Sequence, residues 1–177
     1  MRVPTAVKAL KQLRQLYYNL IHPYLSYAII GWGSVSASRL KKNQVKQNHI
    51  IRLMVFASLY GKNTDSALPL MNLVDILTVE DIFILLLLQF SHHWHKKQLP
   101  SILDDYFRYA SYAHTYNTSY ASKSNFYKSR LRINIGKTTL STLAVDHWQK
   151  LPHDIKELNL FRIFPRKAKQ YLLVKQL

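Results

Sequence analysis

Cysteine is absent from the 177 residues of the chain, and glycine and proline are scarce, with four and six copies. Without cysteine the chain has no disulfide, no thiol nucleophile and no cysteine-rich zinc knuckle. The four glycines are scattered along the sequence, so they form no glycine-rich loop that could hold the phosphates of a nucleotide. Thiol catalysis and P-loop nucleotide hydrolysis are therefore excluded.

Acidic residues are also few, because nine Asp and Glu stand against 25 Lys and Arg, which gives a formal net charge of +16. Positive charges at this density repel one another unless a polyanion neutralises them. Binding to a phosphate backbone is favourable because it releases the counterions condensed on that backbone. The charge therefore favours RNA or DNA as the partner. An anionic membrane surface or an acidic protein could also neutralise this positive charge, so charge alone does not decide among the three kinds of partner.

Long hydrophobic runs are missing as well. The most apolar run, residues 82–88, is far shorter than the roughly 20 residues that span a bilayer, so we expect no membrane span. The charged first residues are not followed by the apolar region of a secretory signal, which predicts an intracellular location, nuclear or cytoplasmic. Hydrophobic residues nevertheless make up 48% of the chain, enough to build a core.

Apolar residues recur every three or four positions in several segments, which predicts a mainly α fold. One helix is expected from Pro4 until His22-Pro23 interrupts it, and a second from about Arg39. The second has an inner face and an opposite face with Lys42, Lys46 and His49; the inner face comprises Leu40, Gln44, Gln47, Ile51 and Met54. Thr78 and Asp81 resemble a capping box that starts a long core helix ending near Trp94.

The second half of the sequence is less regular. A break at Leu99-Pro100 separates a first region, residues 1–98, from a second, residues 99–177, although the two could form one continuous unit. Residues 106–128 are predicted to be an irregular loop, and the alternation at residues 130–135 predicts a short strand that allows one β-hairpin. Helices are expected over residues 140–151 and 159–173, with Pro165 in or near a first turn.

Catalytic and metal-binding patterns are weak. His92, His93 and His95 could share a metal ion, but the spacing is poor and histidine also suits the C-terminal end of a helix. The neighbouring carboxylates Asp104 and Asp105 rarely aim at one magnesium ion, and a helical or turn cap explains them better. Asp146-His147 and His153-Asp154 lack an accompanying serine nucleophile. We therefore expect no cofactor, no metal and no catalysis.

Basic and aromatic residues are interleaved between residues 112 and 132, and this pattern indicates a function more clearly than the catalytic and metal-binding patterns do. Lysine and arginine attract phosphates and tyrosine rings can stack on bases, although the same tyrosines could instead pack a core. A second basic patch lies on the helix that begins near Arg39, where a merely solvated face is the alternative. The predicted nucleic-acid-binding residues are Lys8, Lys11, Lys42, Lys46, Arg52, Lys123, Lys128, Arg130 and Arg132.

Several short motifs occur in an order that resembles the C-terminal part of reverse transcriptases from LINE-like, jockey-like non-LTR retrotransposons. They begin with residues 16–27, followed by Gly31-Trp32-Gly33, and continue with residues 47–52. Three more follow downstream: Leu68-Pro69-Leu70 together with Leu99-Pro100, then residues 114–118, then residues 147–152. The resemblance covers nearly the whole chain. It implies a thumb-like helical bundle followed by a helical connector, which in the intact enzyme grips the template–primer duplex.

The sequence departs from that pattern at three positions. Ala28 replaces a usual glycine, Ser119 a usual arginine and Gln149 a usual asparagine, so an anion contact at position 119 is in doubt. The fingers, the palm and its Tyr-x-Asp-Asp signature do not occur, so we expect no polymerase activity from these residues. The rival interpretation is a truncated relic that acts only as a helical interaction module. It would pack against a reverse transcriptase palm or associate with itself through a face that the palm would otherwise cover.

Overall fold

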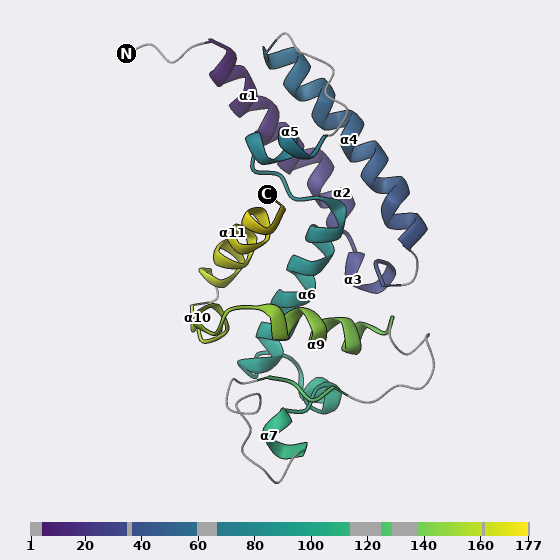
Figure 1. Ribbon diagram of the computed structural model, residues 1–177, viewed down its shortest axis with the longest axis vertical. Coiled ribbons are helices and arrows are strands. Elements are labelled where there is room, and N and C mark those ends of the chain that lie inside the picture. The colour runs from purple at the N-terminus through teal and green to yellow at the C-terminus, as the bar shows by residue number, and fades with distance from the viewer. Residues whose placement is uncertain are drawn as a thin grey trace. The chain divides into compact units, whose positions relative to one another are not determined.

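The computed structural model describes residues 5–34, 37–59, 67–113, 125–128, 138–160 and 162–176. These residues are mainly helical, which confirms the predicted fold class (Figure 1). The chain divides into two compact units, Met1–Phe83 with Tyr171–Leu177, and Ile84–Gln170. The divisions fall inside helices, whereas the sequence suggested a boundary after residue 98.

The first unit is built around two long helices, α1 (Thr5–Leu16) and α4 (Ala37–Leu59), which lie side by side and run in opposite directions (Figure 1). Four shorter elements connect or follow them: η1 (Tyr17–Ile21), α2 (His22–Ser26), α3 (Ile29–Trp32) and α5 (Leu68–Leu73). Helices α1 and α4, η1, and α5 with its flanking residues pack around one core, whose buried members are Tyr17, Ile51, Met54, Val55, Ala67, Met71, Val74 and Ile76.

The first helix does not stop at His22-Pro23, as the sequence predicted, but continues as α2 to Ser26. Proline lacks the N–H that would bond four residues back, and a π-helical turn just before it changes the hydrogen-bond register. The N–H of His22 reaches the carbonyl of Tyr17, five residues back, and Pro23 then sits in the first turn of α2. The proline is thus accommodated by a wider turn instead of a break.

The inner face of α4 is as predicted, because Gln47 and Ile51 are fully buried while Lys42 and Lys46 are exposed. A buried glutamine needs partners, and Gln47 donates from its amide nitrogen to the Tyr17 hydroxyl at 2.7 Å and to the Leu77 carbonyl at 2.8 Å. These bonds tie α4 to two other segments of the core.

Helix α6 (Val79–His95) begins at the predicted pair of Thr78 and Asp81, which forms one of the two bonds of a capping box, and it ends one residue beyond the predicted end. The N–H of Asp81 donates to the Thr78 hydroxyl at 3.1 Å, and that hydroxyl donates to the Asp81 carboxylate at 2.6 Å. At the other end Lys97 adopts a φ of 53°, and the N–H of Gln98 returns to the His93 carbonyl at 2.9 Å. Such a left-handed residue is a common way to end a helix.

The second unit contains the rest of α6 followed by η2 (Ser101–Tyr106), α7 (Ala110–Ala113), α9 (Leu140–Lys150), α10 (His153–Lys156) and most of α11 (Phe164–Gln176). The helix predicted over residues 140–151 is confirmed. The one predicted over 159–173 begins later, with Pro165 as its second residue. The strand predicted at residues 130–135 lies outside the described residues.

Stacked aromatic rings form the core of the second unit. The ring of Phe126 lies between those of Phe107 and Trp148, with centroid distances of 4.8 Å and 5.0 Å and interplanar angles of 14° on both sides. Phe126 is fully buried, so this member of the basic and aromatic stretch belongs to the core. A single antiparallel bridge pairs its backbone with Tyr109.

Candidate nucleic-acid interface

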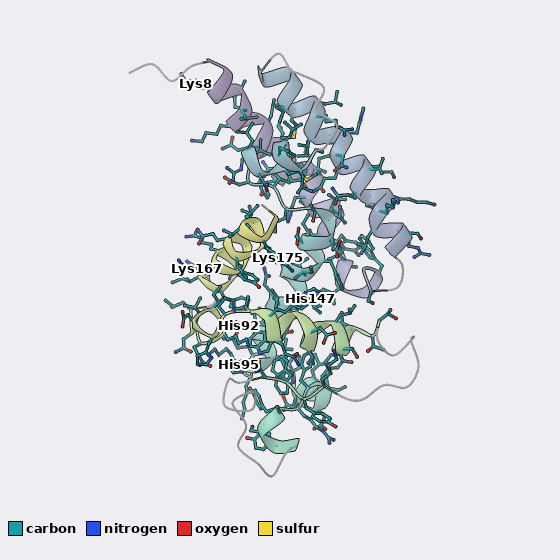
Figure 2. All side chains as sticks on the ribbon, viewed as in Figure 1. Lys8, His92, His95, His147, Lys167 and Lys175 are labelled. Atoms are coloured by element: carbon teal, nitrogen blue, oxygen red, sulfur yellow. The ribbon has the colours of Figure 1, made fainter. Side chains whose placement is uncertain are left out.

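The predicted basic residues of the first unit lie on the outer surfaces of its two long helices. Lys8 and Lys11 are exposed on α1, with Lys8 near the start of that helix (Figure 2), and Lys42 and Lys46 are exposed on α4. Arg52 lies on the margin of the same face of α4 and is only partly exposed. Its contact with a phosphate is therefore less favoured than that of the two lysines.

A groove between α3 and the first turns of α4 brings Lys42 and Lys46 together with residues that the sequence prediction missed. We call it the basic groove; its lining residues are Trp32, Arg39, Lys42, Asn43, Val45 and Lys46. Arg39, Lys42 and Lys46 share one face because they are three and four positions apart on one helix. That spacing was a signal for Arg39 in the sequence, but nothing local linked Trp32 to α4.

The Trp32 ring has a fixed position at one side of the basic groove. Its indole N–H donates to the Tyr27 carbonyl at 2.9 Å, across the turn that joins α2 to α3. Gly33 then brings the chain so close to Phe83 that a Cβ atom at position 33 would lie 2.6 Å from its ring. The indole therefore occupies a defined place beside three cationic side chains, as a base-stacking or cation-binding ring requires.

The remaining predicted residues belong to the second half of the chain. Lys128 is exposed, but its ammonium group pairs with the carboxylate of Asp146 on α9, which neutralises part of its attraction for a phosphate. Lys123, Arg130 and Arg132 lie outside the described residues. Of the residues predicted in this half, the one that the structure describes is therefore ion-paired.

A second groove, in the second unit, is rich in aromatic rings. We call it the tyrosine groove; its lining residues are Trp94, Lys97, Asp104, Phe107, Arg108, Tyr109, Tyr112 and Tyr127. Tyr112 is 84% exposed and Tyr127 37% exposed, so two rings of the aromatic stretch reach solvent while Phe126 does not. Burial raises the pKa of Tyr109 above its ordinary value, so this hydroxyl stays protonated at neutral pH.

The histidines of α6 have partners within the protein. His92, labelled in Figure 2, is buried. It donates from Nε2 to the Leu158 carbonyl at 2.8 Å and stacks on Phe164 with centroids 3.9 Å apart. His95 Nδ1 lies 2.9 Å from the Tyr109 hydroxyl. Burial lowers the pKa of both imidazoles. Among the described residues no cluster of three or more His, Asp or Glu could hold a metal ion.

The carboxylates considered for catalysis are not gathered around a common point. Asp104 and Asp105 are both exposed on η2 and face different hollows: Asp104 lines the tyrosine groove, and Asp105 lines the one beside it. Asp146 pairs with Lys128, and Asp154 is exposed in the first turn of α10. These positions fit solvated or ion-paired carboxylates.

Comparisons of the chain with models of protein families, with curated proteins and with solved structures found no match. In the described part of the chain, every helix is too short or too polar to cross a bilayer.

Proposed function

We propose that this protein binds nucleic acid through the phosphate backbone, without catalysis and without reading sequence. The observation that carries the proposal is the basic groove. There, Arg39, Lys42 and Lys46 project from the outer face of α4 beside the fixed ring of Trp32. The opposite face of the same helix is anchored in the core, so the cations are presented by a rigid element. Cationic contacts to phosphates position a protein on a strand but carry no base specificity.

The resemblance to non-LTR reverse transcriptases supports a more specific version of this proposal. In that version the first unit is a thumb-like piece that grips the backbone of a template–primer duplex, and a reverse transcriptase palm is a second partner. The charge of +16 supports a polyanionic ligand independently of the resemblance. Nucleic acid as the ligand implies a nuclear or cytoplasmic location.

The test is the affinity of a Lys42→Glu/Lys46→Glu variant for a 20-base-pair duplex, measured by fluorescence anisotropy at several salt concentrations. We expect binding to be lost at physiological salt. A milder Lys42→Gln/Lys46→Gln variant should reduce the slope of log affinity against log salt by roughly 0.7–0.9 per phosphate contact removed. Unchanged affinity in both variants would refute the proposal.

A matched control separates a local contact from the general effect of charge. Arg166 and Lys167 are exposed neighbours on α11, and the variant Arg166→Glu/Lys167→Glu changes the net charge by the same amount. If the basic groove is the site, this variant should retain most of the affinity for the duplex. An equal loss in both variants would mean that the duplex responds only to total charge.

One observation favours a second function, that of a helical interaction module. Large apolar side chains are exposed at three- or four-residue intervals along α1, η1, α2 and the residue that follows α2: Leu16, Leu20, Tyr24 and Tyr27. A row of this kind is typical of a surface that packs against another protein or a second copy. Sedimentation velocity distinguishes the two functions. Self-association that Leu20→Glu abolishes, together with no binding of the duplex, would favour the interaction module.

A further inference from the structure

The tyrosine groove has the features of a binding site for unpaired bases. We propose that it binds single-stranded RNA or DNA by stacking bases on Tyr112 and Tyr127. This inference rests on the proposed function, because it also takes nucleic acid as the ligand, but it concerns a different surface in the second unit. The basic groove would contact the backbone, and the tyrosine groove would contact bases.

Neighbouring aromatic rings that line the groove contact one another. The exposed ring of Tyr112 lies beside Tyr109, with centroids 6.0 Å apart and an interplanar angle of 60°, and Tyr109 in turn contacts Trp94 at 5.3 Å. The indole N–H of Trp94 donates to the Leu103 carbonyl at 2.9 Å, which fixes its ring. The inner rings are thus held by packing, and the outer ring of Tyr112 is left to solvent.

Backbone and side-chain bonds hold the two sides of the groove together. The N–H of Tyr127 donates to the Arg108 carbonyl at 2.7 Å, and the N–H of Ala110 donates to the Asn125 carbonyl at 2.9 Å. The amide oxygen of Asn125 accepts a 2.9 Å bond from the ammonium of Lys156, and both side chains are buried. A groove that is already ordered loses little conformational entropy when a ligand binds.

The charges at the groove favour a nucleic-acid strand but are too few to bind one alone. Lys97 and Arg108 are exposed there and Asp104 opposes them, which leaves a small positive excess. Stacking must therefore supply most of the affinity, with Arg108 available for a phosphate or for the face of a base. Bases in a duplex are already stacked and do not offer their faces, so the ligand must be unpaired.

The experiment compares a labelled 12-nucleotide single strand with a 20-base-pair duplex for the whole chain and its variants. Tyr112→Ala/Tyr127→Ala should weaken binding of the single strand by roughly tenfold or more, since each base–aromatic stack contributes that much. Binding of the duplex should be unchanged. Tyr112→Phe keeps the ring and should retain the affinity for the single strand. Ile102→Ala, which truncates another exposed side chain of the same unit, should have no effect.

The outcomes separate this inference from the proposed function. If the Tyr112→Ala/Tyr127→Ala variant, shown to be folded by circular dichroism, binds the single strand as well as the unmodified protein does, the tyrosine groove is not the site. Equal weakening of single strand and duplex would also overturn the inference. Binding of the duplex that depends on Lys42 and Lys46 would uphold the proposed function in either case, whereas its absence would refute that function.

Discussion

The amide nitrogen of Gln47 donates a 2.7 Å hydrogen bond to the hydroxyl of Tyr17, inside the core of the first unit. Both side chains are at most 1% exposed, and burial raises the pKa of Tyr17 to about 12. The same amide also satisfies the Leu77 carbonyl. One polar side chain of α4 therefore fixes η1 and the segment before α6 against the face opposite the basic groove.

Replacing Gln47 with alanine should lower the free energy of unfolding by about 1–3 kcal/mol, because buried polar groups lose their partner. Chemical denaturation followed by circular dichroism measures the change. Gln12 on α1 is exposed, so Gln12→Ala serves as the control and should have little effect. A Gln47→Ala variant as stable as the unmodified protein would show that this bond does not stabilise the unit.

The two glycines around Trp32 should respond differently to the same substitution. A Cβ atom at Gly33 would lie 2.6 Å from both the Ile29 carbonyl oxygen and the Phe83 ring, whereas one at Gly31 would meet nothing within 4 Å. Gly33→Ala should therefore lower the unfolding free energy by about 1–3 kcal/mol, as overpacking generally does. Gly31→Ala should instead raise it by about 0.4–1 kcal/mol, because Gly31 is helical and alanine lowers the entropy of the unfolded chain. Similar melting temperatures for the two variants would contradict this expectation.

Ala28 adopts a φ of 49° in the turn between α2 and α3, a left-handed conformation that glycine adopts more readily. Ala28→Gly should raise the unfolding free energy by about 0.5–1 kcal/mol, since relief of strain exceeds the added entropy of the unfolded chain. A fall in stability on thermal unfolding would contradict this.

Periodicity and capping predicted much of the fold. The two faces of α4 and the start of α6 at Thr78 follow from local spacing, which is why the sequence was sufficient to find them. The helix end predicted at His22-Pro23 was wrong. Proline strains a regular α-helix, but the π-helical turn before Pro23 relieves that strain, so the helix continues.

The candidate site was less predictable because its parts come from different elements. Lys42 and Lys46 were identified from charge and spacing on one helix, whereas Trp32 belongs to a different element, α3. Phe126 and Tyr127 are neighbours in sequence, yet one is in the core and the other lines the tyrosine groove. The sequence alone does not show which of these two neighbouring rings is buried. The backbone bridge between Phe126 and Tyr109 places the Phe126 ring in the core, and this pairing is a long-range contact.

His92 should make the second unit less stable as the pH falls. Burial, aided by the charge of Lys96, keeps its folded-state pKa below the ordinary value of 6.5, despite the bond to Leu158. The unfolded chain therefore binds a proton at higher pH than the folded one does. The contribution of neutral His92 to the stability of the folded state is complete above pH 6.5. It is lost as the pH falls from 6.5 toward the folded-state pKa of His92.

The measurement is the denaturation midpoint of the whole chain between pH 7.5 and pH 5. His92→Gln keeps a side-chain N–H that can reach the Leu158 carbonyl but removes the titrating ring, so its midpoint should fall less over this range. It should also be less stable at pH 7.5, because stacking on Phe164 is lost. His153→Gln, at an exposed position, should follow the unmodified protein. Parallel pH curves for all three proteins would show that protonation of His92 does not destabilise the folded state.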